Sequence, residues 1–295
     1  MASLLVLGAF GIASCDDNDI PPDATPPTVE VVGEASKQAL IEADSTLKFT
    51  VSVNAPEGFD SLEITSDRGF SDDSTTSDVN SFDVDLDIDV SSKEPGAEVF
   101  TFKVTDALGQ TDTVNVTATY RLAALSYSVT LGNAVDPMQM DGISQTNIAF
   151  LSLNSGLSFA RDDIEADLDL VNTTDVSAVY VQTDENPRLV ETAAEGIQDI
   201  AFWEGNKFTI EYRNIDQATY DAIAAATGLD QVIAIDEAFA NGTPGSDVLT
   251  SVKAYQISTG ETGVFTTEAG AGNVNSGDGL VDNEFTFNVI TNRNK

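Results

Sequence analysis

The ten residues from Ser81 to Val90, SFDVDLDIDV, alternate apolar and acidic side chains after the first serine. A period of two places successive side chains on opposite faces of an extended chain, so the segment predicts a strand with one core face and one acidic face. The core face would hold Phe82, Val84, Leu86, Ile88 and Val90, and the acidic face would hold Asp83, Asp85, Asp87 and Asp89.

The acidic face has two interpretations. Carboxylates two residues apart on a strand lie about 7 Å from one another and repel unless salt or a cation screens them. The face is therefore either a calcium-binding face or a solvated face that blunts edge pairing. Calcium takes about six to eight oxygens that converge on one point, whereas a straight strand spreads its carboxylates out, which favours the solvated face.

Similar short strand-like runs fill residues 28–120, and clusters of Gly, Pro, Asn or Asp separate them. They cover 28–32, 46–53, 61–65, 81–90, 98–105 and 111–119. Their spacing and alternation predict a β-sandwich of about 90 residues. The segment resembles the immunoglobulin-like domains of bacterial surface lipoproteins, and the last two strands, with the turn from Asp106 to Gln110 between them, carry most of the resemblance.

Residues 126–295 combine strand-like runs with helical patterns. The runs cover 126–131, 147–153, 176–182, 207–211, 252–257, 262–266 and 284–290. Asp216 is placed to cap the N-terminus of a helix with an apolar stripe from Tyr220 onward. Gly228 is placed to end this helix in the left-handed backbone conformation that glycine favours. A shorter helix is predicted over 162–168. The predicted fold class is mainly β, with an N-terminal immunoglobulin-like β-sandwich followed by a β-rich α+β domain that has one or two short helices.

The chain begins with an apolar segment, Leu4 to Ile12, which is too short to cross a bilayer and is followed by the only cysteine. The residues Ile12 to Cys15, IASC, resemble the lipobox of bacterial lipoprotein signals. The resemblance implies a signal peptide over 1–14 and lipid on Cys15 that anchors the protein in the outer membrane. The alternative is a short buried segment with an ordinary free cysteine. Residues 15–27 are acidic and rich in proline, and predict an extended tether.

Composition limits the classes of function. The chain has 49 acidic and 13 basic residues, no histidine and a formal net charge of −36. The negative electrostatic field of such a chain repels nucleic acid, and nucleic acid is therefore excluded as a partner. The same charge suits saline surroundings or the binding of divalent cations. Without histidine, His-based triads and His-ligated metal sites are also excluded, so no catalytic residue is assigned. If the protein is an enzyme, the alternative is a glycoside hydrolase that uses a pair of carboxylates.

The order of motifs in the C-terminal domain resembles a module common in Bacteroidota surface lipoproteins of unassigned function. The matching segments are AFLSLNSG at 149–156, VSAVY at 176–180, WEGNKF at 203–208, ATYDAI at 218–223 and VKAYQISTGETGVF at 252–265. The resemblance implies a cell-surface module without known catalytic residues. The acidic residues just after Cys15 resemble the surface-export signal of Bacteroidota lipoproteins, which implies an outward-facing location.

One loop before the last strand is a candidate metal site. It resembles a calcium loop with one inserted residue, although an Asn-, Gly- and Asp-rich hairpin turn explains the same residues. The candidate ligands are Asn273, Asn275, Asp278, Asp282 and Glu284.

Two aromatic residues are candidates for ligand binding. Trp203 and Tyr212 could line a platform that stacks on a glycan, whereas burial in the core is the structural alternative.

These observations predict a noncatalytic, lipid-anchored cell-surface protein with a spacer domain and a C-terminal domain that binds another envelope protein or a glycan. The alternative is a structural, pilin-like subunit of a surface fibre that polymerises by strand addition, with residues 284–290 as the donor strand. A polysaccharide-acting enzyme is the third class.

Overall fold

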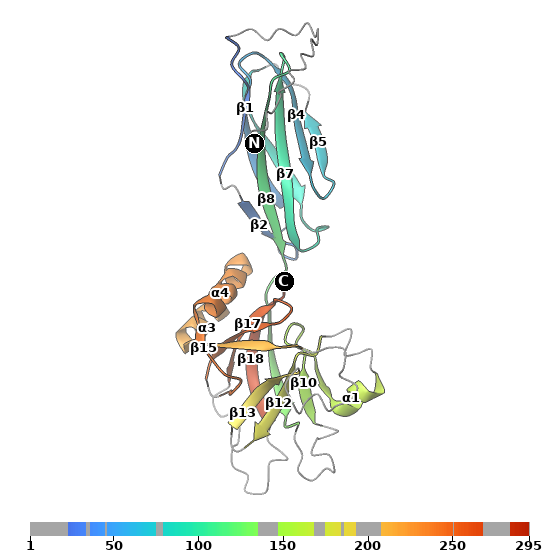
Figure 1. Cartoon of the computed structure of the whole chain (residues 1–295), viewed down its shortest axis with the longest axis vertical. Coiled ribbons are helices and arrows are strands. Elements are labelled where there is room, and N and C mark those ends of the chain that lie inside the picture. Colours follow the sequence, from blue (N-terminus) through green and yellow to red (C-terminus); the bar gives the residue numbers. More distant parts are fainter. Residues whose placement is uncertain are drawn as a thin grey trace, which may run out of the picture. The chain divides into compact units, whose positions relative to one another are not determined.

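The computed structural model describes residues 23–33, 36–44, 46–74, 79–134, 147–167, 175–183, 186–192, 208–249, 251–267 and 284–294. The chain divides into two compact units. The first comprises Met1–Lys37, Lys48–Ile88 and Ala97–Ala118, and the second comprises Gln38–Leu47, Asp89–Gly96 and Thr119–Lys295. Strands dominate, so the prediction of a mainly β chain is confirmed (Figure 1). None of the helices in the described ranges is long and apolar enough to span a membrane.

The N-terminal strands form two sheets. The three-stranded sheet has the order β1 (Thr28–Val31), β3 (Thr46–Asn54), β6 (Ser81–Asp89). The five-stranded sheet has the order β2 (Ser36–Leu40), β8 (Thr111–Arg121), β7 (Gly96–Asp106), β4 (Phe59–Ser66), β5 (Ser71–Ser74). The sequence patterns predict six of these strands and miss β2 and β5, and β5 is missed because its residues, SDDS, include no apolar side chain.

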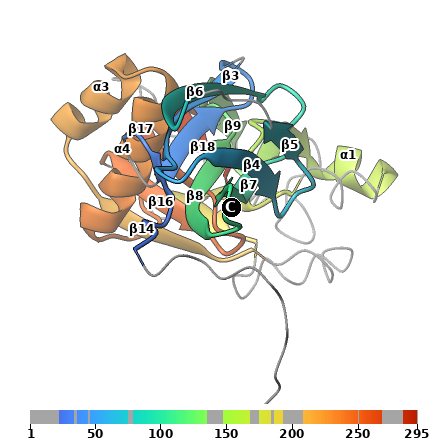
Figure 2. The same ribbon diagram turned by 90° about the horizontal axis from the view of Figure 1, so that it is seen from above.

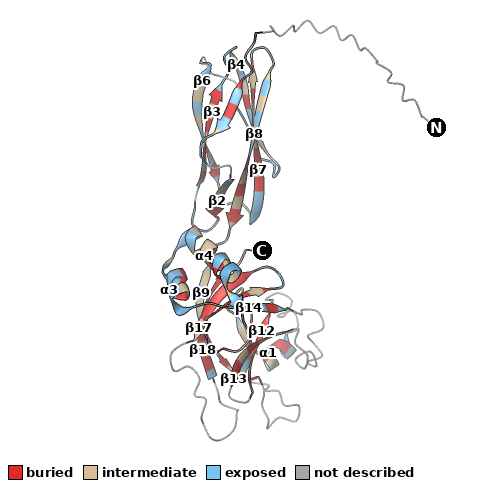
Figure 3. Ribbon diagram, turned by 60° about the vertical axis from the view of Figure 1, so that its left-hand side comes forward, coloured by how far each residue is buried: buried red, intermediate tan, exposed pale blue. Residues whose placement is uncertain are grey.

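The two sheets pack face to face. Phe49 of β3 lies between Phe100 and Phe102 of β7, with ring centroids 5.3 and 5.7 Å apart, and these strands belong to different sheets. The alternation predicted from Ser81 onward is confirmed, because Leu86, Ile88 and Val90 are buried and the four aspartates are exposed. Phe82 and Val84 on the same face as Leu86 are half-buried. The alternation of buried and exposed positions along the strands is visible in Figure 3.

The second unit contains two further antiparallel sheets. The six-stranded sheet has the order β15 (Thr243–Pro244), β14 (Ile210–Asn214), β16 (Lys253–Ile257), β17 (Thr262–Thr267), β18 (Glu284–Asn292), β9 (Leu125–Gly132). The four-stranded sheet has the order β11 (Ser158–Ala160), β10 (Ile148–Leu151), β12 (Ala178–Thr183), β13 (Asn186–Glu191). Strand β18, which the fibre hypothesis uses as a donor, pairs on both sides, so its release would break two ladders.

These sheets and the helices stack in layers. Helices α3 (Gln217–Ala225) and α4 (Gly228–Asn241) cover one face of the six-stranded sheet, where Ile223 and Ile235 pack on Val264 of β17. The opposite face packs on the four-stranded sheet through a second core that includes Tyr180 and Phe287. Helix α1 (Arg161–Ala166) covers the far face of the four-stranded sheet, so α1 and the α3–α4 pair lie on opposite sides (Figures 1 and 2).

The helix predictions are partly confirmed. Asp216 caps α3 as expected, because its Oδ1 accepts a hydrogen bond from the backbone N–H of Thr219 at 2.8 Å. Gly228 has a positive φ of 63°, as a left-handed residue should. However, Gly228 is the first residue of α4 and not the residue that ends α3. A second helix therefore begins at the position where the sequence pattern predicts that the helical region ends.

The turn after β10 explains the AFLSLNSG motif in structural terms. Gly156 has a φ of 75° and its N–H donates to the carbonyl of Ser152 at 2.8 Å, and a Cβ on Gly156 would lie 2.9 Å from the ring of Tyr127. The hydroxyl groups of Tyr127 and Tyr255 both donate to the carbonyl of Leu153, at 2.9 and 3.3 Å. This motif therefore fixes the turn against the half-buried Tyr127 and the buried Tyr255.

Candidate functional site

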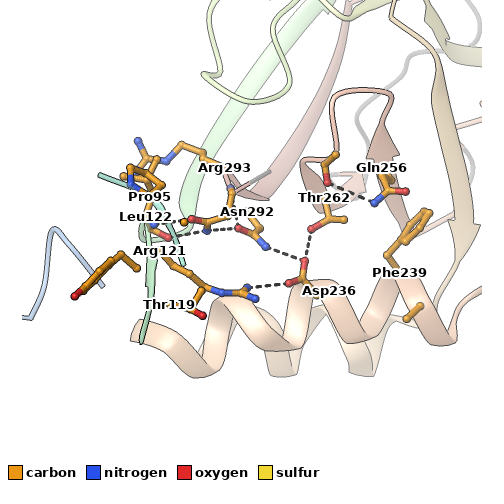
Figure 4. Close-up of a pocket in the computed structure, with 15 residues that line it drawn as sticks. Pro95, Thr119, Arg121, Leu122, Asp236, Phe239, Gln256, Thr262, Asn292 and Arg293 are labelled. Carbon is orange, nitrogen blue, oxygen red and sulfur yellow. Dashed lines mark hydrogen bonds and ion pairs between the residues drawn. The ribbon is translucent and has the colours of Figure 1, made fainter. Parts of the chain in front are cut away.

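A cavity of about 780 Å³ is lined entirely by residues of the second unit. Its walls come from α4, from β16 and β17 with the turn between them, and from the ends of β8 and β18 with the residues that follow each (Figure 4). The beginning of β7 completes the lining. The lining residues are Pro95, Gly96, Thr119, Tyr120, Arg121, Leu122, Asp236, Phe239, Ala240, Gln256, Gly260, Thr262, Asn292, Arg293 and Asn294.

Asp236 of α4 is the centre of a hydrogen-bond network in this cavity. Its Oδ2 accepts from Nη1 of Arg121 at 3.0 Å, and its Oδ1 accepts from Oγ1 of Thr262 at 2.6 Å. Nδ2 of Asn292 also donates to Oδ1, at 2.8 Å. Both carboxylate oxygens are thus paired with donors from three different strands or segments (Figure 4), which fixes the side chain and neutralises its charge.

The end of the chain forms the second half of the wall. Asn294 bonds the backbone of Leu122 in both directions, because its Oδ1 accepts from the N–H at 2.7 Å and its Nδ2 donates to the carbonyl at 3.0 Å. Arg293 donates through Nη2 to Glu42 Oε2 at 2.8 Å and to the carbonyl of Ala123 at 3.1 Å. The residues after β18 therefore hold the chain that follows β8 in place.

The cavity combines one carboxylate with aromatic and amide side chains. Asp236 is the one carboxylate among its fifteen lining residues, and glycoside hydrolysis needs two carboxyl groups, of which one has to be free to give or take a proton. Phe239 supplies a half-buried aromatic side chain, and Gln256 supplies a polar side chain that is also half-buried. Because Asp236 is paired with Arg121 and Arg293 with Glu42, the walls favour an uncharged polar ligand.

Most residues of the predicted sites lie outside the described residues. These are Cys15, Trp203 and four of the five calcium-loop residues, Asn273, Asn275, Asp278 and Asp282. The fifth, Glu284, begins β18 and is exposed.

Tyr212 lies in the core between the two sheets of the second unit. It is 7% exposed, and its hydroxyl donates to the carbonyl of Leu189 at 2.6 Å. Burial raises the pKa of Tyr212 well above its ordinary value, and the ring meets Phe265 edge-on with centroids 6.3 Å apart. The ring of Tyr212 is therefore part of the core and offers no exposed face to a glycan.

The acidic face of β6 is paired across the sheet with β3. Thr50 donates through Oγ1 to Asp85 at 2.8 Å, and Ser52 donates to Asp83. Lys48 forms an ion pair with Asp87 at 3.6 Å, in which both side chains are more than half exposed. Within the described ranges no three or more His, Cys, Asp or Glu side chains are placed to hold a metal ion. These contacts are those of a solvated strand face.

A smaller hollow of about 470 Å³ lies beside Tyr212, and its acidic groups have structural partners. Nη2 of Arg188 donates to Asp247 Oδ2 at 2.6 Å, and Glu191 Oε2 accepts from the backbone N–H of Ile210 at 2.8 Å. The sequence patterns predict neither this hollow nor the larger cavity. Arg121 and Asp236 of the larger network lie 115 positions apart, so no local motif marks them.

Comparisons with known proteins add little to this description. No family model matches the chain, and no curated protein matches it. Among solved structures, the chain is similar to a DUF4466 family protein from Parabacteroides merdae, with a TM-score of 0.31 and 9% sequence identity. The similarity covers 91% of this chain and 99% of that one. A similarity of this size carries no conclusion about function.

Proposed function

We propose that this protein is a noncatalytic, lipid-anchored protein of the bacterial outer membrane that faces the cell exterior. In this proposal lipid on Cys15 holds the chain in the membrane, and the acidic, proline-rich residues up to Pro27 act as a tether. The N-terminal sheets act as a spacer, and the C-terminal domain binds an uncharged polar partner, either a glycan or a segment of another envelope protein. The observation that carries the binding role is the cavity around Asp236.

The cavity supports binding because its polar groups are held in place and its charges are matched. Asp236 has a donor on each oxygen, so it is not available as a general acid or base. A fixed set of hydrogen-bonding groups beside aromatic rings is typical of binding sites for polar molecules, since little conformational freedom is lost when the ligand enters.

The spacer role rests on the N-terminal sheets. We propose that they form an immunoglobulin-like sandwich, because two antiparallel sheets pack face to face and the last two strands, β7 and β8, are neighbours joined by a tight turn at Asp106. The core of this sandwich is built from Phe49, Phe100 and Phe102. A packed domain without an assigned site is suited to a spacer.

The membrane anchor is tested in a Bacteroidota host grown with an alkyne analogue of palmitate. We expect the label on the unmodified protein and none on a Cys15→Ser variant, and we expect added protease to remove the protein from intact cells. An unlabelled protein, or one protected until the cells are lysed, would contradict the proposed location.

The binding role is tested on a glycan array with the full mature chain and two variants. Gln256→Ala removes a polar group of the cavity, and Gln217→Ala removes an exposed glutamine on α3 as the matched control. We expect a glycan signal that falls at least tenfold for Gln256→Ala and is unchanged for Gln217→Ala. Equal loss in both variants, or product release from the glycans, would count against a binding site in this cavity. Ordered filaments in negative stain would favour the fibre subunit instead.

A further inference from the structure

Lys253, which is buried, and Asn214, which is half-buried, form a cross-strand pair in the six-stranded sheet. They lie directly opposite each other, at the first residue of β16 and the last residue of β14, and Lys253 Nζ donates a hydrogen bond to Asn214 Oδ1. Lys253 is 4% exposed. Lysine is rarely buried unless a carboxylate pairs with it, and here the partner of its nitrogen is a neutral amide.

The pair is at the margin of the core between the two sheets of the second unit. Tyr255 and Ile257 follow Lys253 at positions two and four along β16, so all three side chains share one face of the strand, and the latter two belong to that core. The cross-strand neighbour of Tyr255 is Tyr212, which belongs to the same core. Lys253 is therefore shielded from water on the core side of the sheet, whereas Asn214 is half-buried.

Burial changes the state of the lysine nitrogen. Desolvation lowers the pKa of Lys253 below its ordinary value, and the negative charge of Asp247 opposes only part of this effect. A larger fraction of the nitrogen is thus the neutral amine than at an exposed lysine. The neutral amine carries the lone pair that attacks carbonyl carbons, which is how buried lysines become nucleophiles.

The amide of Asn214 is held in place for such an attack. Its Nδ2 donates to the carbonyl of Pro244 at 2.9 Å, and its Oδ1 lies so close to Gly245 that a Cβ there would be 3.1 Å away. The same loop continues to Asp247, whose carboxylate acts on Lys253 electrostatically. The amine and a fixed carboxamide are therefore held in contact, and fixed geometry of this kind can remove a large part of a reaction barrier.

We propose that Lys253 and Asn214 join spontaneously in an amide cross-link between β16 and β14, with loss of ammonia. The Nζ lone pair forms a bond to Cγ of Asn214, and the carbonyl electron pair moves to Oδ1. One proton moves from Nζ to Nδ2. The Cγ–Nδ2 bond then breaks, Nδ2 leaves as ammonia and the carbonyl re-forms. An amine and a carboxamide give a secondary amide and ammonia, so no oxidant or cofactor is needed.

The cross-link would join β14, which has few hydrogen bonds on its outer side, covalently to β16. The neighbour of β14 on its outer side is the two-residue strand β15, so β14 is nearly an edge strand. The chain between Asn214 and Lys253 contains α3 and α4, and the new bond would close it into a loop. A closed loop restricts the unfolded chain and so stabilises the folded one, as disulfides do.

Intact-mass spectrometry of the denatured, purified mature chain tests the proposal. We expect a mass lower than the sequence mass by one ammonia, and a tryptic digest that contains a branched peptide joining the segments of Lys253 and Asn214. Lys253→Met and Asn214→Ala should each carry the full mass and melt at lower temperature. Lys103→Met, which changes an exposed lysine, should keep the ammonia loss.

Three results would overturn the cross-link, and none depends on whether the variants fold. The first is a full sequence mass for the unmodified protein after prolonged incubation at neutral and mildly alkaline pH. The second is a digest without the branched peptide. The third is ammonia loss that persists in Lys253→Met, because that result assigns the loss to asparagine cyclisation instead.

Discussion

The contact between Gly263 and Tyr255 offers a sharp test of packing in the second unit. The two residues are opposite each other on β17 and β16, and the tyrosine ring covers the place where a side chain on Gly263 would begin. The methyl group of a Gly263→Ala variant would lie 2.3 Å from Cζ and from the hydroxyl oxygen of Tyr255. Either the ring or the strand would therefore have to move.

The ring has little room to move. Tyr255 is fully buried, its hydroxyl donates to the carbonyl of Leu153 at 3.3 Å, and its centroid is 6.2 Å from that of Phe265. Overpacking of this kind costs about 1–3 kcal/mol, and the gain from replacing glycine is less than about 1 kcal/mol. We expect a net loss of about 2 kcal/mol, which for a unit of this size lowers Tm by roughly 4–8 °C.

Tryptophan fluorescence during thermal unfolding is a suitable assay, because the only tryptophan of the chain, Trp203, belongs to the second unit. The control is a double-mutant cycle with Tyr255→Val, which removes the ring. In that background Gly263→Ala should cost nothing or should stabilise. An equal loss of Tm in both backgrounds would refute the clash with the ring and indicate a backbone effect.

Three further predictions follow from single contacts. Asp236→Ala leaves three donors unpaired and should destabilise the second unit by about 2 kcal/mol in denaturant unfolding, whereas Glu237→Ala, an exposed neighbour of equal charge, should have almost no effect. Hydrogen bonds from Thr219 lower the pKa of Asp216 in the folded protein. The cap therefore stabilises the fold at pH values above the pKa that Asp216 has in the unfolded chain, and this stabilisation is lost as the pH falls through the lower pKa of the folded state. Asp216→Asn should remove this acid dependence from the melting temperature. Added NaCl should raise Tm by screening the acidic face of β6, and calcium should do no more than magnesium at equal ionic strength; a rise specific to calcium would instead indicate a calcium site.

Strands with regular alternation were predictable from the sequence, because period two is a local property of the chain. Strands without it were missed for identifiable reasons. β13 begins with Asn186 and Pro187, and proline argues against a strand, although it is tolerated at the edge of a sheet, where β13 lies.

Helix α4 shows a different failure of sequence reasoning. Val232, Ile235 and Ala238 recur every three residues and are all buried, so a helical period was present in the sequence. Gly228 has the positive φ that the sequence predicts, but the same pattern indicates the end of a helical region at this residue. A glycine with positive φ can end one helix or begin the next. Such a glycine alone therefore does not distinguish a helix followed by a loop from two helices separated by two residues.

The distribution of the few cations explains why a strongly acidic chain can still build the cavity. In the first unit the described ion pairs of Lys48 and Lys103 are exposed, and such pairs contribute little. In the second unit, arginines pair with Asp236, Glu42 and Asp247 at 2.6 to 3.0 Å, with at least one partner of each pair less than a third exposed. Arginine suits this role because its planar group bonds carboxylates and carbonyls at once. These arginines thus pair with nearby acids of the second unit, and the negative charge in excess of them repels anionic molecules.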